Sequence, residues 1–481
     1  ELTNMIMMQM DMDEIKKEPQ EQLHQTITTF NTEIQKLKNV DNILELNLQI
    51  VKIKAIERSK KLREDAITWI LNIIPKAVNF IKEHISGTTG YIAEIKKYLG
   101  ASAEKVQISH ELPEFIRQTE LALKKLPFVY QRLYQLTPTD EDRFFVSRQT
   151  ELENLEKAFS DWNKDRFVTT ALISEKGSGA TSLLKIFLNK IDTDIPIIHQ
   201  SSDQKVYTKD AYLAFFAEIL KQDKFESNEQ IIDSLNNGSD NLILILENLH
   251  HFFIKKVNGF ECQKMLFELM SRTSKKVFWI GSYTIHSWEY LKKTVAVSEH
   301  FIREIHLQKF DGATLDEVIF KRNNLSGYKI IFEPSRESKN SKSFQKMNED
   351  EKQEFLRKQF FIELYQMSNG NVSLAQLYWL RSTCSVSDDT INISSLREID
   401  VSFVKDLPGD HLFAMHTILI HDGLKLEDYS LALNIPESMC RNILIPMLEK
   451  GLLIRPKEKF NINPIIFRQI VSLLKSHNFI N

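Results

Sequence analysis

The segment that most restricts how this 481-residue chain folds is ALISEKGSGATSLLKIFLNKI, residues 171–191. It begins with an apolar run, continues through a loop with two glycines, and ends with apolar residues at helical spacing. This order predicts a buried strand, a tight turn and a helix. Because backbone N–H groups gather where such a loop enters a helix, the segment also predicts a site for a phosphate group.

The loop retains part of the phosphate-binding consensus G-x-x-x-x-G-K-[ST]. In SEKGSGAT, residues 174–181, Ser174 replaces the first glycine and Ala180 replaces the lysine. Lys176 lies in the loop, at a position that does not aim it at a γ-phosphate. Without an ammonium group to neutralise the β- and γ-phosphate oxygens, we expect slow hydrolysis at most. The residues predicted to contact phosphate are Gly177, Ser178, Gly179, Ala180, Thr181 and Ser182, and Thr181 is also a predicted Mg²⁺ ligand.

Apolar segments alternate with helical patterns around this loop. Strands are expected at TTALIS, IPIIH, NLILILENLHHFF, KKVFWIGSY and FIREIHL, which cover residues 169–174, 195–199, 241–253, 275–283 and 301–307. Strands that alternate with helices are typical of a parallel α/β sheet. The segment is therefore expected to be one strand–loop–helix unit of a larger sheet.

Three further motifs resemble those of AAA+ and STAND-type P-loop NTPases. FFVSRQTELENL, residues 144–155, is similar to the box that opens many of these ATPases. LILILENLHHF, residues 242–252, resembles their second nucleotide motif, with Glu247 where the Mg²⁺-ordering aspartate is expected. Asn248 stands where a glutamate would activate water. FWIGSY, residues 278–283, resembles the next strand, and this implies that Ser282 senses the γ-phosphate.

The resemblance extends into the segments that follow the predicted sheet. SNGNVSLAQLYWLRS, residues 368–382, resembles the lid helix that reaches back to the nucleotide, with Val372 and Ser373 at positions where the families carry proline and arginine. The resemblance covers residues 140–481, in the order of an origin-recognition-like ATPase core, lid and winged helix. It implies an α/β P-loop NTPase core with a parallel sheet, an N-terminal all-helical region, a helical lid and a C-terminal winged-helix domain. The implied ligand is ATP or ADP with Mg²⁺, and its binding is expected to be weak because the motifs are degenerate.

The expected domains follow from these patterns. They are a helical interaction module (1–105), linker helices (106–139), the P-loop NTPase-like core (140–308), the helical lid (309–405) with an exposed polar loop at 335–353, and the winged helix (406–481). The N-terminal helices carry apolar stripes but no site chemistry, which favours docking of a protein partner or self-association. The whole pattern predicts a nucleotide-binding regulatory or scaffold protein that acts as a conformational switch.

The predicted winged helix leaves a DNA-binding role open. Its helix 437–450 carries two basic residues against two acidic ones, and a wing turn adds Arg455, Lys457 and Lys459. A recognition helix normally brings a surplus of basic residues to DNA, and this helix has none. The resemblance to STAND-type proteins implies that the module serves as an intramolecular clamp, and this role is favoured over DNA contact. The alternative function is a DNA-binding, origin-recognition-like ATPase. A third class is a slow ATPase with Glu247 as its only acid.

Composition excludes several other classes. The net charge of −3 does not favour a nucleic-acid coat or membrane-surface protein, and the three cysteines lack metal-ligand spacing. The apolar run at 66–81 is interrupted too early to be a transmembrane segment, so a cytoplasmic location is expected. The pair His250–His251 has no cysteine or second histidine pair at ligand spacing, so the sequence disfavours a metal site there.

Overall fold

The computed structural model describes residues 126–134 and 144–480, apart from residues 239, 388 and 397–399. The chain divides into two units, Glu1–Ile108 and Ser109–Asn481, and all described residues belong to the second. The predicted helical module (1–105) and most of the predicted linker helices lie outside the described residues. Helix α5 (Phe128–Leu133) is the first described element.

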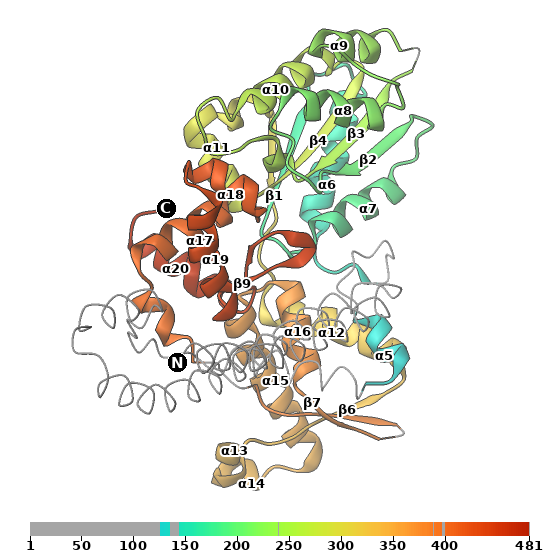
Figure 1. Cartoon of the computed structure of the whole chain (residues 1–481). Coiled ribbons are helices and arrows are strands. Elements are labelled where there is room, and N and C mark those ends of the chain that lie inside the picture. The colour runs from blue at the N-terminus through green and yellow to red at the C-terminus, as the bar shows by residue number, and fades with distance from the viewer. Residues whose placement is uncertain (1–125, 135–143, 239, 388, 397–399, 481) are drawn as a thin grey trace, which may run out of the picture. The chain divides into compact units, whose positions relative to one another are not determined.

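The core of the second unit is a five-stranded parallel sheet in the order β2-β3-β4-β1-β5 (Figure 1). Its strands are β1 (Thr169–Ser174), β2 (Ile197–Ser201), β3 (Leu242–Glu247), β4 (Val277–Thr284) and β5 (Arg303–His306). Strand β1 pairs with β4 on one side and β5 on the other, and all six of its residues are buried. A sheet that is covered on both faces needs such continuous apolar strands.

Helices cover both faces of the sheet. Successive β1 side chains point to opposite faces, so each face carries apolar residues that must be buried. Ala171 and Ile173 join one apolar cluster, and Leu172 joins another. The first cluster packs under α8 (Lys209–Ile219), α9 (Asn228–Asn236), α10 (Glu261–Thr273) and α11 (Ile285–Val295). The second packs under α6 (Gln149–Trp162) and α7 (Ala180–Lys190). Short 3₁₀ helices, η2 (Leu249–Phe252) and η3 (Val297–His300), follow β3 and α11. The predicted parallel α/β core is confirmed.

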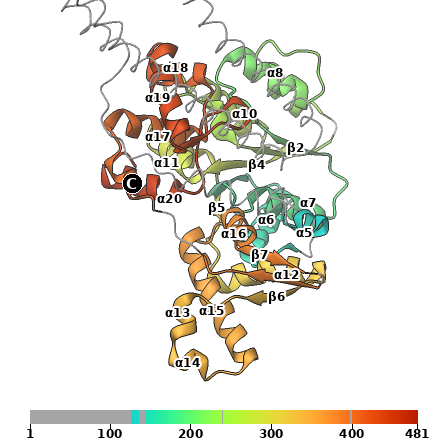
Figure 2. The same cartoon turned by 60° about the horizontal axis from the view of Figure 1, so that its bottom comes forward.

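The lid combines helices with a small sheet that the sequence reasoning missed. Its main helices are α12 (Gly312–Ser326), α15 (Glu349–Ser368) and α16 (Val372–Arg381). Beside them, β6 (Lys329–Phe332), β7 (Thr383–Val386) and β8 (Thr390–Ile393) form a sheet in the order β6-β8-β7 (Figure 2). The sequence predicts the helices of the lid but not this sheet, because strands of four residues are too short to show a clear period.

The segment 335–353 is not the exposed irregular loop that we expected. It forms α13 (Arg336–Asn340), α14 (Lys342–Gln345) and the start of α15. Phe344 is only 6% exposed and joins the lid core, and Asn348 and Glu351 form a capping box at the start of α15. One buried aromatic residue and a good N-cap thus order a stretch whose composition is otherwise polar.

Helix α5 is anchored in the same lid core. Tyr130 and Tyr134 are fully buried, the Tyr134 hydroxyl donates to the Ile319 carbonyl at 2.8 Å, and Trp379 Nε1 donates to the Tyr130 hydroxyl at 2.9 Å. The short helix therefore belongs structurally to the lid, although more than 170 residues separate it from Ile319 along the chain.

The C-terminal domain (residues 409–480) contains three helices, a two-stranded antiparallel ribbon and a last helix, preceded by the 3₁₀ helix η4 (Ser402–Asp406). The elements are α17 (Gly409–His421), α18 (Leu426–Leu433), α19 (Glu437–Glu449), β9 (Leu453–Ile454), η5 (Pro456–Glu458), β10 (Asn461–Ile462) and α20 (Phe467–Ser476). This order agrees with the one expected from the sequence, and the assignment as a winged helix stays a prediction. Among the described helices, none combines the length and hydrophobicity that a bilayer span requires.

Candidate functional site

The glycine loop connects β1 to the N-terminus of α7, as the sequence predicts. Gly177 and Gly179 have φ values of +79° and +95°, which side-chain-bearing residues rarely adopt. Ser178 N donates to the Glu175 carbonyl at 3.1 Å, and Gly179 O accepts from Leu183 N in the first turn of α7. Ser178, Ala180 and Ser182 lie on the same turn and helix start. The geometry is that of a phosphate-binding loop, while phosphate contact by these residues stays a prediction.

The two predicted Mg²⁺ ligands meet in the structure. The Thr181 hydroxyl donates to Glu247 Oε2 at 2.5 Å, although 66 residues separate them along the chain. Glu247 lies at the end of β3, where it is 7% exposed. A hydroxyl and a carboxylate are oxygen ligands of the kind that Mg²⁺ prefers, so this pair fits the ion.

His199 is a member of this site that the sequence analysis did not identify. Its Nε2 lies 2.7 Å from Glu247 Oε1, so the carboxylate has a partner at each oxygen. The β2–β3 pairing, with Ser201 opposite Glu247, brings the histidine there. Its place at the expected end of a strand next to β3 was the available signal, but strand order is not readable from the sequence.

Ser282 and Asn248 also meet at this edge of the sheet. Asn248 N donates to Ser282 Oγ at 3.0 Å, and Asn248 Nδ2 donates to Ser201 Oγ at 3.0 Å. Asn248 adopts a left-handed conformation with φ +63°. Ser282 is therefore adjacent to the end of β3, and the amide of Asn248 offers no carboxylate that would accept a proton from water.

The lid contacts the glycine loop directly. Asn371 Nδ2 donates to the Lys176 carbonyl at 2.8 Å and to Glu175 Oε1 at 3.1 Å, and Ser373 N donates to the Gly177 carbonyl at 3.1 Å. Burial raises the pKa of Glu175, and the Asn371 hydrogen bond partly opposes that rise. The start of α16 therefore contacts the glycine loop, and α16 lies where the resemblance predicts a lid helix.

Arg148 supports the loop from the side of α6. Its Nη2 donates to the Ser178 carbonyl at 3.1 Å, its Nη1 pairs with Glu151 at 2.9 Å, and its guanidinium lies 4.0 Å from the centre of the Phe310 ring. Arg148 belongs to the box at 144–155 that the sequence resemblance identified. The structure thus makes this box a support of the loop.

The C-terminal domain also contacts the loop. Lys176 Nζ lies 3.0 Å from Asp422 Oδ2 and 3.1 Å from Oδ1, across 246 residues of sequence. Burial by itself favours the protonated acid, yet Lys176 and His250 together hold the pKa of Asp422 below its ordinary value. Asp422 is the C-cap residue directly after α17, so this helix points its C-terminus at the loop.

Further contacts join the C-terminal domain to the core beside this pair. Ser287 Oγ of α11 donates to the Ile420 carbonyl at 2.8 Å, and Figures 1 and 2 both place α17 next to α11. Lys205 Nζ donates to the His421 carbonyl at 2.9 Å, and Lys255 N donates to His421 Nε2 at 3.0 Å. Burial lowers the pKa of Lys205 to about 7, with nearby Lys459 adding to the effect.

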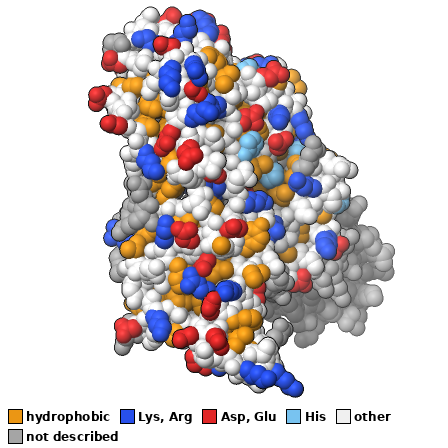
Figure 3. Space-filling model, turned by 180° about the vertical axis from the view of Figure 1, so that it is seen from behind, with side chains coloured by type: hydrophobic (Ala, Val, Ile, Leu, Met, Phe, Trp, Pro, Cys, Tyr) orange, Lys and Arg blue, Asp and Glu red, His pale blue; other side chains and the backbone are white. Residues whose placement is uncertain are grey.

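Two of the three predicted basic wing residues face the core. Lys459 donates to the Asp203 carbonyl, and Lys457 Nζ lies 4.0 Å from Asp203 Oδ2. Arg455 lies over the Phe460 ring of its own domain at 4.9 Å. On the face of the molecule drawn in Figure 3, basic and acidic side chains are interspersed. Both lysines of this turn are thus close to Asp203 of the same chain.

Comparisons with known proteins give structural similarity alone. No protein-family model matches the chain, and no curated protein matches its sequence. The chain is similar to the ORC2 protein of Aeropyrum pernix in ADPNP–ADP complexes, with 13% identity over 72% of this chain and 98% of that chain, at a TM-score of 0.41. It is similar to the Aeropyrum pernix ORC1 protein in complex with DNA, with 12% identity over 70% and 96% and a TM-score of 0.39.

The RuvB Holliday junction branch migration motor of Thermotoga maritima matches with 13% identity over 70% of this chain and 99% of that chain, at a TM-score of 0.32. These values describe likeness only. The sequence-based resemblance to AAA+ P-loop NTPases is confirmed as a statement of fold, because the parallel sheet and the glycine loop between β1 and α7 have the expected arrangement.

Proposed function

We propose that this protein is a weakly nucleotide-binding switch of the AAA+/STAND kind, in which the C-terminal domain docks on the phosphate-binding loop. The observation that carries the proposal is the ion pair between Lys176 of the loop and Asp422 of the C-terminal domain, at 3.0 Å. The loop is therefore part of the contact between domains. A ligand that changes the loop would change that contact as well.

Nucleotide binding and docking of the C-terminal domain are coupled because both compete for the same side chain, Lys176. Lys176 is the only cationic residue between Ser174 and Thr181, since Ala180 replaces the usual lysine. The position of Lys176 does not aim it at a γ-phosphate, but the negative charge of the other nucleotide phosphates at the loop attracts its ammonium group and competes with the Asp422 carboxylate for it. Because a ligand shifts an equilibrium toward the state that it binds better, nucleotide binding favours release of the C-terminal domain, and docking weakens nucleotide affinity.

The other site residues have supporting roles in this proposal. Gly177, Ser178, Gly179 and the start of α7 hold phosphate, Thr181 and Glu247 hold Mg²⁺ when it is bound, and Ser282 lies where a γ-phosphate would be sensed. Mg²⁺ would supply positive charge next to the phosphates. Asn248 supplies no carboxylate for a water molecule, so the proposed switch responds to binding, with slow hydrolysis at most.

Two other roles are weaker on present observations. DNA binding through the C-terminal domain is the alternative function, but Lys457 and Lys459 face Asp203 and would have to be released first. A protein partner or self-association through residues 1–105, and a cytoplasmic location, stay predictions from the sequence.

The test replaces Asp422 by asparagine, which removes the negative charge and keeps the shape of the side chain. Asp422→Asn should raise the affinity for ADP or a non-hydrolysable ATP analogue with Mg²⁺ about tenfold, which corresponds to about 1.4 kcal/mol, measured by titration calorimetry. Glu437→Gln removes one exposed negative charge from the same domain, where Glu437 pairs with Arg441 of its own helix, and should leave affinity unchanged.

Hydrogen exchange supplies the second measurement. Nucleotide should speed amide exchange in α17 of the wild type, because release exposes the docked helix. If Asp422→Asn stays folded and binds nucleotide as the wild type does, while exchange in α17 is insensitive to nucleotide, the proposed coupling is wrong.

A further inference from the structure

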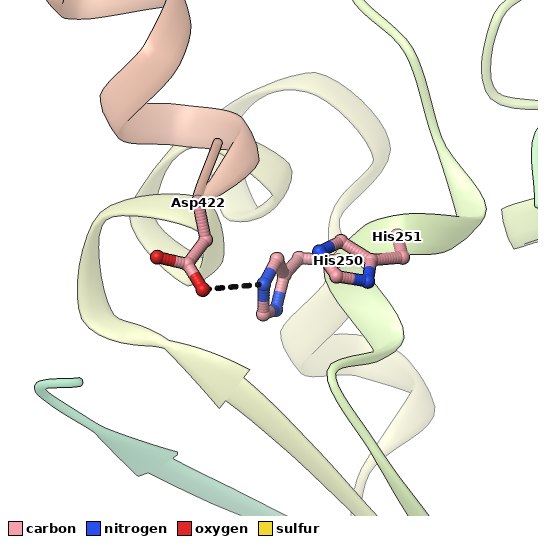
Figure 4. A group of neighbouring side chains, drawn as sticks. All are labelled: His250, His251 and Asp422. Atoms are coloured by element: carbon pink, nitrogen blue, oxygen red, sulfur yellow. Dashed lines mark ion pairs between the residues drawn. The ribbon is translucent and has the colours of Figure 1, made fainter. Parts of the chain in front are cut away.

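A second group of polar side chains lies beside the docked helix α17, and the nucleotide motifs do not include it. His250 and His251 belong to η2, directly after β3, and Asp422 is the C-cap residue of α17 (Figure 4). One ligand atom from each of these three residues lies within 4.8 Å of the other two. The two elements come from different domains, so the cluster forms only when the C-terminal domain is docked.

The histidines are buried without enough hydrogen-bond partners. Among the described residues, His250 is 0% exposed and neither ring nitrogen has a hydrogen-bond partner, while His251 is 3% exposed and its Nε2 has none. His250 Nε2 lies 3.8 Å from Asp422 Oδ2, which is too long for a hydrogen bond. Each unsatisfied buried polar atom destabilises the folded state. An additional group that lies between these three side chains and binds the free histidine nitrogens would remove this loss.

One contact holds His251 in an orientation that is common among metal ligands. His251 Nδ1 lies 2.5 Å from the Ser202 carbonyl, so Nδ1 carries the proton and Nε2 keeps a free lone pair. Metal-binding histidines commonly donate their second nitrogen to a carbonyl in this way. The two oxygens of Asp422 allow Lys176 to stay on Oδ1 while a cation takes Oδ2.

We propose that His250, His251 and Asp422 bind one divalent transition-metal cation of the Zn²⁺ type, which joins the core to the C-terminal domain. Two imidazoles and one carboxylate with a water molecule form a common zinc ligand set. Ligand atoms around tetrahedral zinc lie about 3.3 Å apart, so the 3.8 Å pair must close by about 0.5 Å, and the cluster, whose ligand atoms lie within 4.8 Å of one another, must contract around the ion. Mg²⁺ and Ca²⁺ prefer oxygen ligands, which disfavours them here.

Positive charge near the cluster acts against the ion. Lys205 Nζ donates to the His250 carbonyl at 3.3 Å, and Lys176 pairs with Asp422. Coulomb repulsion from these ammonium groups weakens cation binding. Removal of the Lys205 charge should therefore raise the affinity of the site for the cation. None of the three ligands belongs to the glycine loop, so the site goes beyond the proposed switch, although a nucleotide that releases the C-terminal domain would also separate the ligands.

The experiment uses the full chain after treatment with a chelator, titrated with Zn²⁺ by calorimetry, and with Co²⁺ as a visible-absorption probe of tetrahedral geometry. The wild type should bind one equivalent. His251→Gln and Asp422→Asn should each weaken binding about 100-fold or more. Lys205→Met should strengthen it about tenfold. His411→Gln is the matched control, because His411 is also buried and lies at the opposite end of α17.

Lys176→Gln separates this site from the switch, because it removes the loop ion pair and leaves all three ligands. It should retain the metal. Circular dichroism establishes that each variant is folded, and Asp422→Asn provides a second ligand variant if His251→Gln unfolds. The proposal is overturned if the wild type binds no more Zn²⁺ than the folded ligand variants do, and water then satisfies the histidine nitrogens.

Discussion

At the scale of single residues, Ala180 is the departure with the clearest chemical consequence. It is the first residue of α7, directly after Gly179, and Thr181 next to it already contacts Glu247. The loop therefore provides the backbone conformation and the hydroxyl for a nucleotide with Mg²⁺, but lacks the ammonium group at the usual position. Replacement of Ala180 by lysine tests whether the loop has a cavity that accepts a phosphate group.

We predict that Ala180→Lys strengthens nucleotide binding without restoring fast hydrolysis. An ammonium group in place adds charge-assisted hydrogen bonds of about 1.5–3 kcal/mol, or about one to two decades in affinity. Hydrolysis also needs a proton acceptor for water, which Asn248 does not provide. Titration calorimetry with a non-hydrolysable ATP analogue, together with phosphate release, measures both effects.

The double variant Ala180→Lys with Asn248→Glu should be needed before turnover rises. If Ala180→Lys stays folded and leaves nucleotide affinity unchanged, the cavity is closed and the loop has a structural role only. That result would also remove the basis for a nucleotide-operated switch.

At the scale of elements, the loop and α16 fit together through a glycine. A Cβ atom added to Gly177 would lie 2.9 Å from Ser373 Cβ, whereas one added to Gly179 would meet nothing within 4 Å. Both glycines have positive φ, so alanine strains the backbone at either position. The difference between the two positions therefore reports the contact between loop and lid.

Gly179→Ala should lower the free energy of unfolding by about 1–2 kcal/mol, because of backbone strain alone. Gly177→Ala should cost about 1 kcal/mol more, because the lid must move as well. Ser373→Gly should recover that extra loss in the Gly177 variant and nothing in the Gly179 variant. Denaturant unfolding of the five chains measures this, and equal losses at both glycines would contradict the predicted contact.

At the scale of the whole molecule, the lid needs a segment from before the core. Tyr130 and Tyr134 of α5 are fully buried against lid residues, and both hydroxyls have partners there. The boundary between the two units lies at residue 108, well before α5. The part of the chain that folds together therefore includes α5.

We predict that a chain lacking residues 1–105 folds as a monomer, whereas a chain lacking residues 1–143 is destabilised by about 3 kcal/mol or more, because two buried tyrosines are lost. Thermal unfolding and light scattering test both. Precipitation of the shorter truncation would show that the N-terminal helices belong to the core.

Acidification should lower the free energy of unfolding, because buried neutral histidines become protonated. His286 of α11 lies beside Phe467 of α20, and burial lowers the pKa of His286 to about 4, with Lys475 and Lys309 adding to the effect. Burial likewise lowers the pKa of His416 to about 4. Unfolded histidines titrate near 6.5, so the stabilisation is complete above about pH 6.5 and is lost as the pH falls toward 4.

Between pH 7.5 and 5, the free energy of unfolding should drop by about 1–2 kcal/mol for each of these histidines. His286→Gln should reduce the drop, and replacement of the exposed His477 by glutamine should not. Denaturant titrations at both pH values measure it, and a drop of equal size in the wild type and His286→Gln would contradict the assignment.

The sequence by itself determined the local units of this protein. Strand β1, the glycine loop and α7 follow from neighbouring residues, because apolar period and glycine conformation act over a few positions. The meeting of Thr181 with Glu247 also followed from the motifs, since parallel strands end at one edge of the sheet. The insertion at 335–353 and the lid strands did not, because one buried Phe344 and four-residue strands leave almost no periodic signal.

Only the tertiary structure decided which distant side chains meet at the docked domain. Asp422 lies 246 residues after Lys176, and no local pattern distinguishes it from the other aspartates. The same holds for its place beside His250 and His251, where sequence spacing argued against a metal site. Periodicity and spacing report the conformation of neighbours along the chain, whereas the packing of one domain on another decides these contacts.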